Sequence, residues 1–257
     1  DEASTLKAIS FYRKYVKGEL HGTNARTAEM CKLVENSSRD VQIAFANELS
    51  LICDKASINV WELIELANKH PRVNILQPGC GVGGHCIPVD PHYLIQKAKS
   101  AGAPVELITS ARSVNSNMPK QVATRILKNT IIQNHNFDDL KVLLLGWSYK
   151  PGISDTRETP SKKLAQELSS LGCTIYTWDP YIPENIRTDE FTNWVNNPSD
   201  AKADIVVLCT AHPEVLALDW EELLSVSRVG LFFDGRRVLN SSELTKIGWT
   251  FSGIGLP

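Results

Sequence analysis

The sequence predicts an α/β protein in two parts: an all-helical region, then a Rossmann-like, doubly wound unit with a parallel sheet. Two observations predict this order. Residues 27–136 contain almost no strand-like run, and their apolar residues recur at helical spacing. Residues 137–257 alternate short apolar runs with helical segments, which is typical of strand–helix–strand units.

The composition is that of an ordinary globular protein, with 257 residues, 42% apolar and 22% charged. A formal net charge of −2, without a long basic run, argues against nucleic acid or a membrane surface as partners. No segment reads as a membrane span or a signal peptide. We therefore expect a cytoplasmic protein whose six cysteines are reduced thiols.

Residues 1–26 have no core of their own. A short helix is predicted at residues 7–16, followed by an extended connection at residues 19–23. We interpret residues 1–26 as the remnant of an upstream cofactor-binding domain and its linker.

The helical region, residues 27–136, opens with a long predicted helix. Apolar residues keep roughly one stripe from about Thr27 to Ala56, and Thr27 is a suitable N-cap. A second helix is expected at residues 60–69, because the following Pro71 disfavours its continuation.

Two more helices should follow a glycine-rich loop at residues 77–91. Asp90 is a suitable N-cap and Pro91 a suitable first residue for a helix that ends near residue 99. The next helix, over residues 104–134, is expected to kink or break at Pro119.

The α/β region, residues 137–257, should begin with a buried parallel strand, because residues 141–146 form a continuous apolar run. A helix is expected at residues 160–171. Further strands are expected at residues 174–178, 203–209, 229–233 and 250–252.

The segment from Gly79 to Gly84 matches the pattern G-x-G-x-x-G, but its context is wrong for a dinucleotide. A strand should precede the pattern and a helix should follow it directly. We expect instead that these glycines, including Gly83, let the backbone approach a ligand and expose Cys86. A metal site made of Cys80, His85, Cys86 and His92 is an alternative, although its spacing fits no standard zinc pattern.

Cys86 is the candidate nucleophile. A thiol just before a helix can have its thiolate favoured by the helix dipole, and Asp90 could hold a water nearby. Lys32 and Asn36 lie four residues apart and share a helix face, where they could stabilise an oxyanion or simply be solvated.

A second candidate site follows the first strand of the α/β region. The loop at residues 146–159 is long and polar and carries Lys150 and Arg157. Ligands bind at this edge of open α/β sheets, so the two cations suit a phosphate, with help from Arg236 or Arg237. A solvated surface loop is the alternative.

Four segments together resemble the UDP-glucose/GDP-mannose dehydrogenase family. Residues 28–36 are similar to its helix with catalytic Lys and Asn, and residues 81–90 to its nucleophile loop. Residues 146–160 and 233–239 are similar to two signatures of its C-terminal domain. The resemblance covers nearly the whole chain.

Within that family, the branch that oxidises UDP-N-acetyl-D-mannosamine is the most similar. Residues 59–64 and 70–79 carry this resemblance, as does His85 before the nucleophile. Cys80 departs from the proline expected at its position and offers a second thiol for oxidation.

The resemblance implies a four-electron oxidation of the C6 alcohol of a UDP-sugar to a carboxylate with two NAD⁺. Cys86 would form a thiohemiacetal and then a thioester, Lys32 and Asn36 would steady the oxyanions, and Asp90 would assist the water or the lysine. NAD would be bound mainly by the missing upstream domain. The resemblance also implies that Arg72 reaches the partner's site in a homodimer formed through the helical region.

Three alternatives remain open at this point. The oxidised sugar could be UDP-glucose or UDP-N-acetylglucosamine, or the chain could be a binding or dimerisation module without turnover. We expect this chain alone not to reduce NAD⁺, because it lacks a strand–glycine loop–helix fingerprint.

Overall fold

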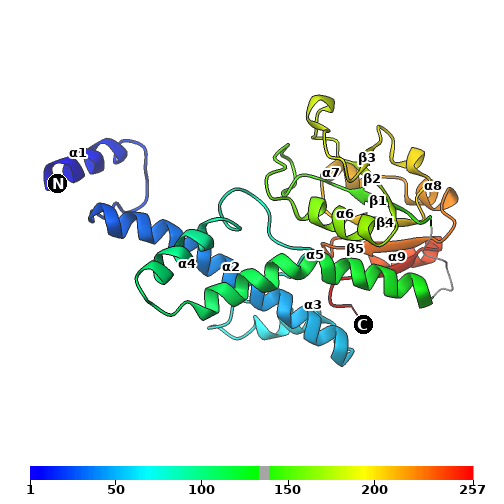
Figure 1. Cartoon of the computed structure of the whole chain (residues 1–257), viewed down its shortest axis with the longest axis horizontal. Coiled ribbons are helices and arrows are strands. Elements are labelled where there is room, and N and C mark those ends of the chain that lie inside the picture. Colours follow the sequence, from blue (N-terminus) through cyan, green and yellow to red (C-terminus); the bar gives the residue numbers. More distant parts are fainter. Residues whose placement is uncertain (133–138, 257) are drawn as a thin grey trace.

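A computed structural model of the protein describes residues 1–132 and 139–256 (Figure 1). The chain begins with α1 (Glu2–Tyr12), which stands apart from the rest in Figure 1 and has no buried residue. This helix lies earlier than expected, because Asp1 caps it by accepting a 2.7 Å hydrogen bond from the Ser4 amide. The predicted helix at residues 7–16 was therefore placed too late in the sequence.

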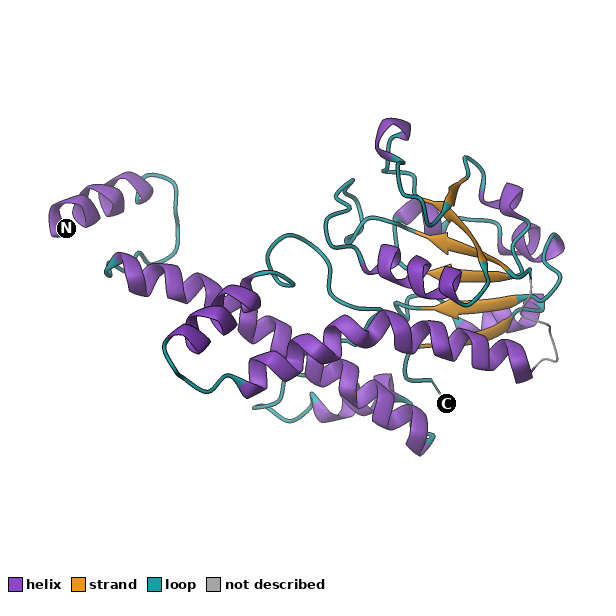
Figure 2. Ribbon diagram, viewed as in Figure 1, coloured by secondary structure: helices purple, strands orange, loops and turns teal. Residues whose placement is uncertain are grey.

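Four helices form the helical region, and no strand lies within residues 27–132 (Figure 2). They are α2 (Ala25–Ala56), α3 (Val60–Ala67), α4 (Asp90–Ser100) and α5 (Glu106–Ile132). The N-cap of α2 is Asn24, whose side chain accepts from the Thr27 amide at 2.9 Å, so Thr27 as the cap was wrong. Asp90 lies in the first turn of α4 and does not cap it.

Of the predicted kink or break at Pro119, the break was wrong, because α5 continues through this residue. A proline removes one backbone hydrogen bond from a helix interior. Its neighbours Met118 and Val122 are 1% and 2% exposed, so packing on both sides holds the helix together across this site.

The α/β region contains a six-stranded parallel sheet with the strand order β3-β2-β1-β4-β5-β6. This is the doubly wound order, which confirms the predicted fold class. The strands are β1 (Lys141–Leu145), β2 (Thr174–Trp178), β3 (Asn193–Trp194), β4 (Ile205–Leu208), β5 (Leu231–Asp234) and β6 (Thr250–Gly253). The sequence did not reveal β3, because two residues are too few to show a pattern.

Helices cover both faces of the sheet. One apolar cluster joins alternate residues of β1, such as Val142 and Leu144, to α6 (Pro160–Ser170) and to Val122 and Ile126 of α5. The other cluster includes Phe232 and packs α7 (Pro213–Leu216), α8 (Trp220–Ser225) and α9 (Ser241–Ile247). Two short 3₁₀ turns, Glu184–Ile186 and Pro198–Ala201, complete the elements.

The two regions are joined in three places. The second half of α5 packs into the core of the α/β region, as Ala123 and its neighbours show. The segment after β6 returns to α3: the Val60 amide donates to Gly255 O at 3.0 Å and Trp61 Nε1 donates to Ile254 O at 2.8 Å. The third junction is the glycine-rich loop. In residues 1–132 and 139–256 no helix has the length and apolar character that crossing a membrane requires.

Candidate active site around Cys86

The glycine-rich loop, residues 77–89, leaves the helical region and lies against the α/β region. Two of its glycines have φ angles in the left-handed region, Gly81 at 137° and Gly84 at 96°. A side chain on Gly83 would collide with Tyr149, since the two Cβ atoms would lie 2.6 Å apart. The surface that Gly83 approaches so closely is thus the α/β region itself.

The loop after β1, residues 146–159, receives the glycine-rich loop. The Gly84 amide donates to the Arg157 carbonyl at 2.9 Å. Beside it, His85 Nδ1 lies 3.9 Å from Asp155 Oδ2. Two predicted site loops, far apart in the sequence, are therefore in direct contact.

Cys86 lies four residues before α4 begins at Asp90 and is partly exposed. Its carbonyl accepts from the amides of Val89 at 3.0 Å and Asp90 at 2.8 Å, so it receives the first helical hydrogen bond. Cys86 therefore stands in the turn just before the N-terminus of α4, where the helix dipole is positive.

Asp90 and Asn36 meet beside Cys86. Asn36 Nδ2 donates to Asp90 Oδ2 at 2.5 Å, which joins the first turn of α4 to the middle of α2. Lys32 lies one helical turn before Asn36, remains exposed, and has Glu35 Oε2 at 3.6 Å. Asn36 and Asp90 are thus in contact next to Cys86 in the chain fold, whereas Lys32 pairs with Glu35, and its part in the site stays a prediction.

Cys80 has a different environment from Cys86. It is 3% exposed, and burial raises the pKa of its thiol to about 11, against the opposing charge of Arg236. A buried thiol with a raised pKa is inert. The expectation that Cys80 is available for oxidation was therefore wrong.

The metal alternative receives no support from the geometry. Among the residues described by the structure, no group of three or more His, Cys, Asp or Glu side chains is arranged to hold a metal ion.

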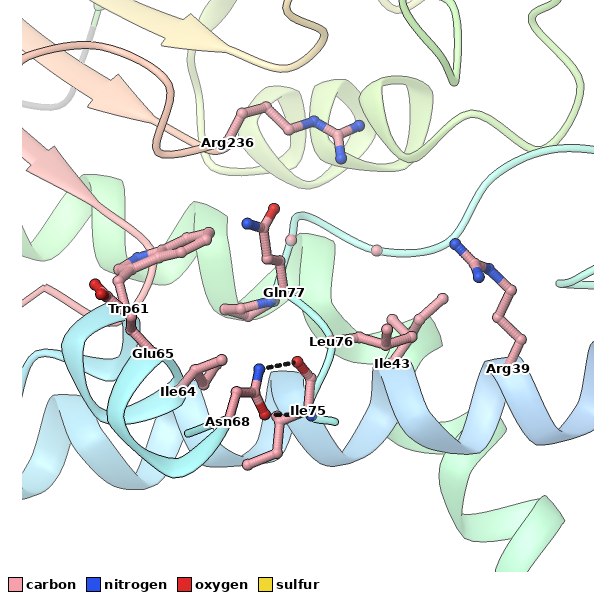
Figure 3. Close-up of a pocket in the computed structure, with 13 residues that line it drawn as sticks. Arg39, Ile43, Trp61, Ile64, Glu65, Asn68, Ile75, Leu76, Gln77 and Arg236 are labelled. Carbon is pink, nitrogen blue, oxygen red and sulfur yellow. Dashed lines mark hydrogen bonds between the residues drawn. The ribbon is translucent and has the colours of Figure 1, made fainter. Parts of the chain in front are cut away.

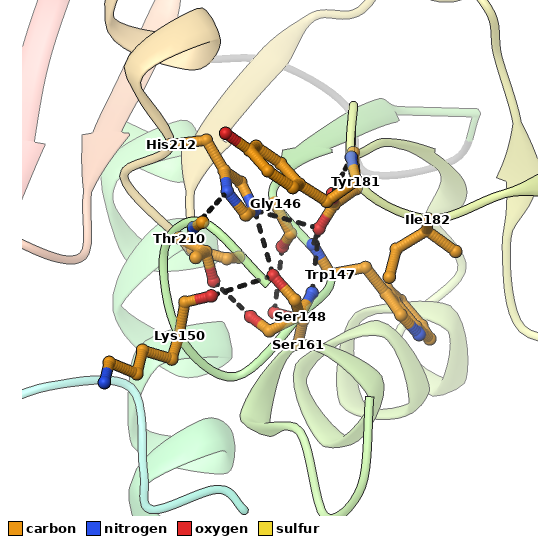
Figure 4. Close-up of polar contacts among 12 residues, drawn as sticks. Gly146, Trp147, Ser148, Lys150, Ser161, Tyr181, Ile182, Thr210 and His212 are labelled. Carbon is orange, nitrogen blue, oxygen red and sulfur yellow. Dashed lines mark hydrogen bonds and ion pairs between the residues drawn. The ribbon is translucent and has the colours of Figure 1, made fainter. Parts of the chain in front are cut away.

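A buried polar network fixes the loop after β1 (Figure 4). Asp179 Oδ2 accepts from the amides of Trp147 at 2.7 Å and Ser148 at 2.8 Å. His212 Nε2 lies 3.1 Å from the same oxygen and 2.9 Å from Ser148 Oγ. Because the Gly152 amide donates to Nδ1 at 3.1 Å, a neutral His212 ring carries its hydrogen on Nε2.

This network also decides whether the α/β region fits NAD. Burial opposes the charge of Asp179, but hydrogen bonds from His212 and Ser148 outweigh it and lower the pKa of Asp179. A dinucleotide fold uses an acidic side chain near the end of its second strand for ribose, and a helix N-terminus for pyrophosphate. Here the carboxylate of buried Asp179 already accepts hydrogen bonds from the loop after β1. Gly81 packs against Pro160 and so covers the start of α6. The α/β region therefore does not fit NAD in that manner.

Lys150 and Arg157 lie on the exposed part of the loop. Figure 4 shows the Lys150 side chain pointing away from the buried network. The Arg157 guanidinium holds Asp155 through Nε at 3.0 Å and Nη2 at 2.6 Å, and this pairing lowers the pKa of Asp155 to about 2. The pKa of Arg157 is raised, first by that bond and in smaller part by nearby Cys86. Binding of phosphate by either cation stays a prediction.

A cavity of about 700 Å³ lies between the two regions (Figure 3). This volume is within the usual range for small-molecule sites. Arg39 from α2 and Arg236 from the loop after β5 face it from different sides, and Trp61 and Ile64 of α3 contribute an apolar wall. The remaining lining residues are Ile43, Glu65, Asn68, Ile75, Leu76, Gln77, Pro78, Gly79 and Gly81.

Arg236 is held in place by contacts within the α/β region. Its Nε donates to Cys209 O at 2.6 Å, and its amide donates to Asp234 Oδ1 at 2.8 Å. The neighbouring Arg237 has a φ of 54° and does not line this cavity. Of the basic residues predicted to bind substrate, Arg236 lines the cavity.

Arg72 lies elsewhere, on the exposed face of the helical region. It lines a second cavity of about 510 Å³ together with Phe45 and Leu107. Phe45 is 53% exposed and Leu107 is 70% exposed. This face is apolar and open in the chain described.

Several cavity residues were missed by sequence reasoning. Trp61 and Asn68 become site residues only because α3 turns back against the segment before the glycine-rich loop. Asn68 Oδ1 accepts from the Ile75 amide at 2.7 Å and its Nδ2 donates to Ile75 O at 3.0 Å. An asparagine just beyond a helix end was the one available signal.

Comparisons with known proteins agree with this architecture. Residues 26–117 match the central domain of the UDP-glucose/GDP-mannose dehydrogenase family, and residues 143–241 match the UDP binding domain of the same family. The first match includes Cys86, and the second includes the loop after β1.

Similar individual proteins come from archaea and bacteria. The UDP-N-acetyl-D-mannosamine dehydrogenase of Methanococcus vannielii is 37% identical over 99% of this chain and 58% of its own length. The NDP-N-acetyl-D-galactosaminuronic acid dehydrogenase of Ralstonia solanacearum is 44% identical over 85% of this chain and 50% of its own length.

A solved structure of a similar dehydrogenase has the same fold as this chain. The UDP-D-ManNAc dehydrogenase of Pyrococcus horikoshii superposes with a TM-score of 0.84 at 37% identity, over 99% of this chain and 58% of that one. The chain thus spans 58% of the length of these two dehydrogenases. From its helical region through its α/β region, the chain belongs to the UDP-glucose/GDP-mannose dehydrogenase family.

Proposed function

We propose that this chain carries the nucleophile and nucleotide-sugar site of an NAD-dependent UDP-N-acetyl-D-mannosamine 6-dehydrogenase. The observation that carries the proposal is the position of Cys86, whose carbonyl accepts from the Asp90 amide just before α4 and beside the Asn36–Asp90 hydrogen bond. The names of the similar mannosamine dehydrogenases support the choice of sugar.

In this proposal the Cys86 thiolate attacks the C6 carbon of a sugar aldehyde. A carbon–sulfur bond forms, and the carbonyl electron pair moves to oxygen. One amide hydrogen of Asn36 is engaged by Asp90, which leaves the other for this oxyanion. Lys32 would serve the same oxygen after leaving Glu35, an exposed pair at 3.6 Å that is weak.

After oxidation to a thioester, water attacks C6, the carbon–sulfur bond breaks, and the Cys86 thiolate leaves. Asp90 is the carboxylate available to hold that water and receive its proton. Hydride transfer is not assigned to residues of this chain, because its α/β region does not fit NAD.

The 700 Å³ cavity supplies a place for the nucleotide. Arg39 and Arg236 suit a diphosphate, and the wall of Trp61 and Ile64 suits a base. Lys150 and Arg157 lie on the neighbouring loop and would add charge when substrate closes against it.

Binding tests the site without requiring turnover. Calorimetry on this chain should show UDP-N-acetylmannosamine binding more tightly than GDP-mannose, with UDP-glucose and UDP-N-acetylglucosamine as competitors. Arg236→Ala should weaken binding by about tenfold or more, since a buried charge-assisted contact contributes about 1.5–3 kcal/mol. Lys120→Ala, on the exposed side of α5, is the matched control. Equal affinity for GDP-mannose would reject the nucleotide assignment.

Turnover tests the nucleophile in the full-length protein. Cys86→Ser should stop acid formation from UDP-N-acetylmannosamine, because a serine alkoxide forms far less readily near neutral pH. Cys80→Ser should remain active, since that thiol is buried and inert. Normal turnover by Cys86→Ser would end this mechanism.

We also propose a cytoplasmic homodimer formed through the helical region. Phe45, Leu107 and Arg72 share an apolar face that an equivalent face could cover. Light scattering should give a dimer, and Phe45→Glu should give a monomer with an unchanged circular dichroism spectrum. A wild-type monomer at micromolar concentration would contradict this.

A further inference from the structure

A directional polar relay lies buried between α2 and α5. Its members are Asp40, Asn47, Arg112 and Asn115, which are at most 5% exposed. None of them lines the 700 Å³ cavity. Four polar side chains at one place in a helix interface demand an explanation, because burying such groups is costly unless each is paired.

The relay begins at the segment that leads into the nucleophile loop. Asn47 Oδ1 accepts from the Gly79 amide at 2.9 Å. Asn47 Nδ2 donates to Asn115 Oδ1 at 2.8 Å, so the side chain joins the segment to α5. Gly79 directly precedes Cys80 and is seven residues from Cys86.

The relay ends at an ion pair. Asn115 Nδ2 donates to Asp40 Oδ1 at 2.8 Å and to the Asp40 carbonyl at 2.9 Å. Arg112 Nε lies 3.2 Å from Asp40 Oδ2. Burial raises the pKa of Asp40 and lowers that of Arg112, while the charge of each partner opposes the change.

The chemistry at the two ends fixes the direction of every bond. A backbone amide can only donate, so the oxygen of Asn47 must face Gly79 and its nitrogen must face Asn115. The nitrogen of Asn115 must then face Asp40, which accepts as a carboxylate. A change of polarity at any one member therefore leaves a buried group unsatisfied.

Gly79 needs such a partner because its segment has no neighbouring strand. Residues 75–79 are held on one side by Asn68 at Ile75 and on the other by Asn47 at Gly79. The second attachment is the buried one, and it directly precedes the turn that passes under Tyr149.

We propose that this relay holds the nucleophile loop in register, which makes Asn47, Asn115 and Asp40 positioning residues for Cys86. The inference rests on the proposed function only in calling Cys86 the nucleophile. The contact with Gly79 is independent of that role.

Thiol labelling of this chain tests the relay without activity. Cys80 follows Gly79 and is buried, so its alkylation reports release of the loop. Cys173 is buried in the α/β region and reports global opening, and exposed Cys31 gives the reference rate. Asn47→Leu leaves the buried Gly79 amide without its acceptor. Labelling of Cys80 should therefore become about tenfold faster, and the rate at Cys173 should not change.

A polarity swap keeps the test valid if Asn47→Leu does not fold. Asn47→Asp still accepts from Gly79 but cannot donate to Asn115, so Cys80 should label faster. Adding Asp40→Asn reverses the relay and should return labelling part of the way to the wild-type rate. Thr130→Val removes a buried hydrogen bond of α5 outside the relay and should leave Cys80 protected.

Two results would overturn the proposal. One is an unchanged Cys80 rate in both Asn47 variants, and the other is equal opening of Cys80 and Cys173. Failure of the proposed function would look different, since Cys86→Ser would turn over while the labelling pattern stayed as described.

Discussion

The interiors of the helical and α/β regions are built differently. The α/β region buries an apolar cluster on each face of its sheet. The buried apolar cluster of the helical region, among the residues described, centres on Cys53, Val60 and Ile64. The buried side chains of α2 are mostly polar, with Asn36, Asp40 and Asn47 among them. Apolar burial thus carries more of the α/β region, and directional contacts and neighbouring surfaces carry more of the helical region.

This difference suits the proposed chemistry. A thiol, an amide and a carboxylate must be fixed at defined angles, and directional hydrogen bonds achieve this better than apolar contacts. The cost is that the helical region depends on other surfaces for apolar burial. The α/β region covers one side of it, and the face around Phe45 is open.

The largest expected effect tests apolar burial. Phe232 is fully buried against Trp220, Trp249 and Phe251. Phe232→Ala should lower the free energy of unfolding by about 3–5 kcal/mol, measured by urea denaturation. Leu171→Ala, at a site 44% exposed in the same region and outside the proposed dimer face, should change it by less than about 0.5 kcal/mol. If both substitutions lowered the free energy of unfolding equally, apolar burial would not be what holds the α/β region together.

The second prediction concerns the polar interior. Arg112→Leu leaves the Asp40 charge buried without its cation and should cost about 3 kcal/mol in unfolding free energy. Arg112→Leu combined with Asp40→Asn removes that charge and should recover part of the loss. If the double variant is no more stable than the single one, the Arg112 side chain acts by packing alone.

The apolar part of the fold was predictable because its signals are local. Four or five consecutive apolar residues announce β1 and β4, and the strand at residues 174–178 was predicted at its observed bounds. Three short helices, α7 to α9, were not predicted, since four to seven residues give too little periodicity.

The site was predictable in part. The contact between Asn36 and Asp90, next to Cys86, agrees with the family resemblance of residues 28–36 and 81–90. The cavity did not, because Trp61 reaches it only through the turn between α3 and residue 75. The relay left a signal that was not used. Asp40 lies four residues after Asn36 and Asn47 seven residues after Asp40, so the three fall on one side of α2.

The third prediction concerns alkaline pH and the α/β region. Burial raises the pKa of Cys173 from 9.0 to about 11. The unfolded chain loses this proton above pH 9 while the folded chain keeps it, so stability falls as pH rises from about 9 to 11. Cys173→Ala should show a shallower decline than wild type, by on the order of 2 kcal/mol at pH 11. Parallel pH profiles would show that Cys173 does not contribute to the decline.

The smallest predicted effect concerns the contact that joins the two regions. Trp61 Nε1 donates to Ile254 O, next to the bond between the Val60 amide and Gly255 O. Trp61→Phe keeps an aromatic ring, makes it smaller and removes one hydrogen bond, which contributes about 1 kcal/mol. Hydrogen exchange at the Val60 amide should therefore become about fivefold faster, because local opening there needs less free energy.

Trp194→Phe is the matched control for this last prediction. In the chain as described, Trp194 Nε1 is buried but has no hydrogen-bond partner, so the same substitution removes no bond. Exchange at Val60 should stay at its wild-type rate, because Trp194 packs against Trp147 and Arg187 in the α/β region and not at this junction. If both variants speed exchange equally, ring size rather than the bond to Ile254 controls this junction. If neither does, the contact between Val60 and Gly255 holds the two regions together without Trp61.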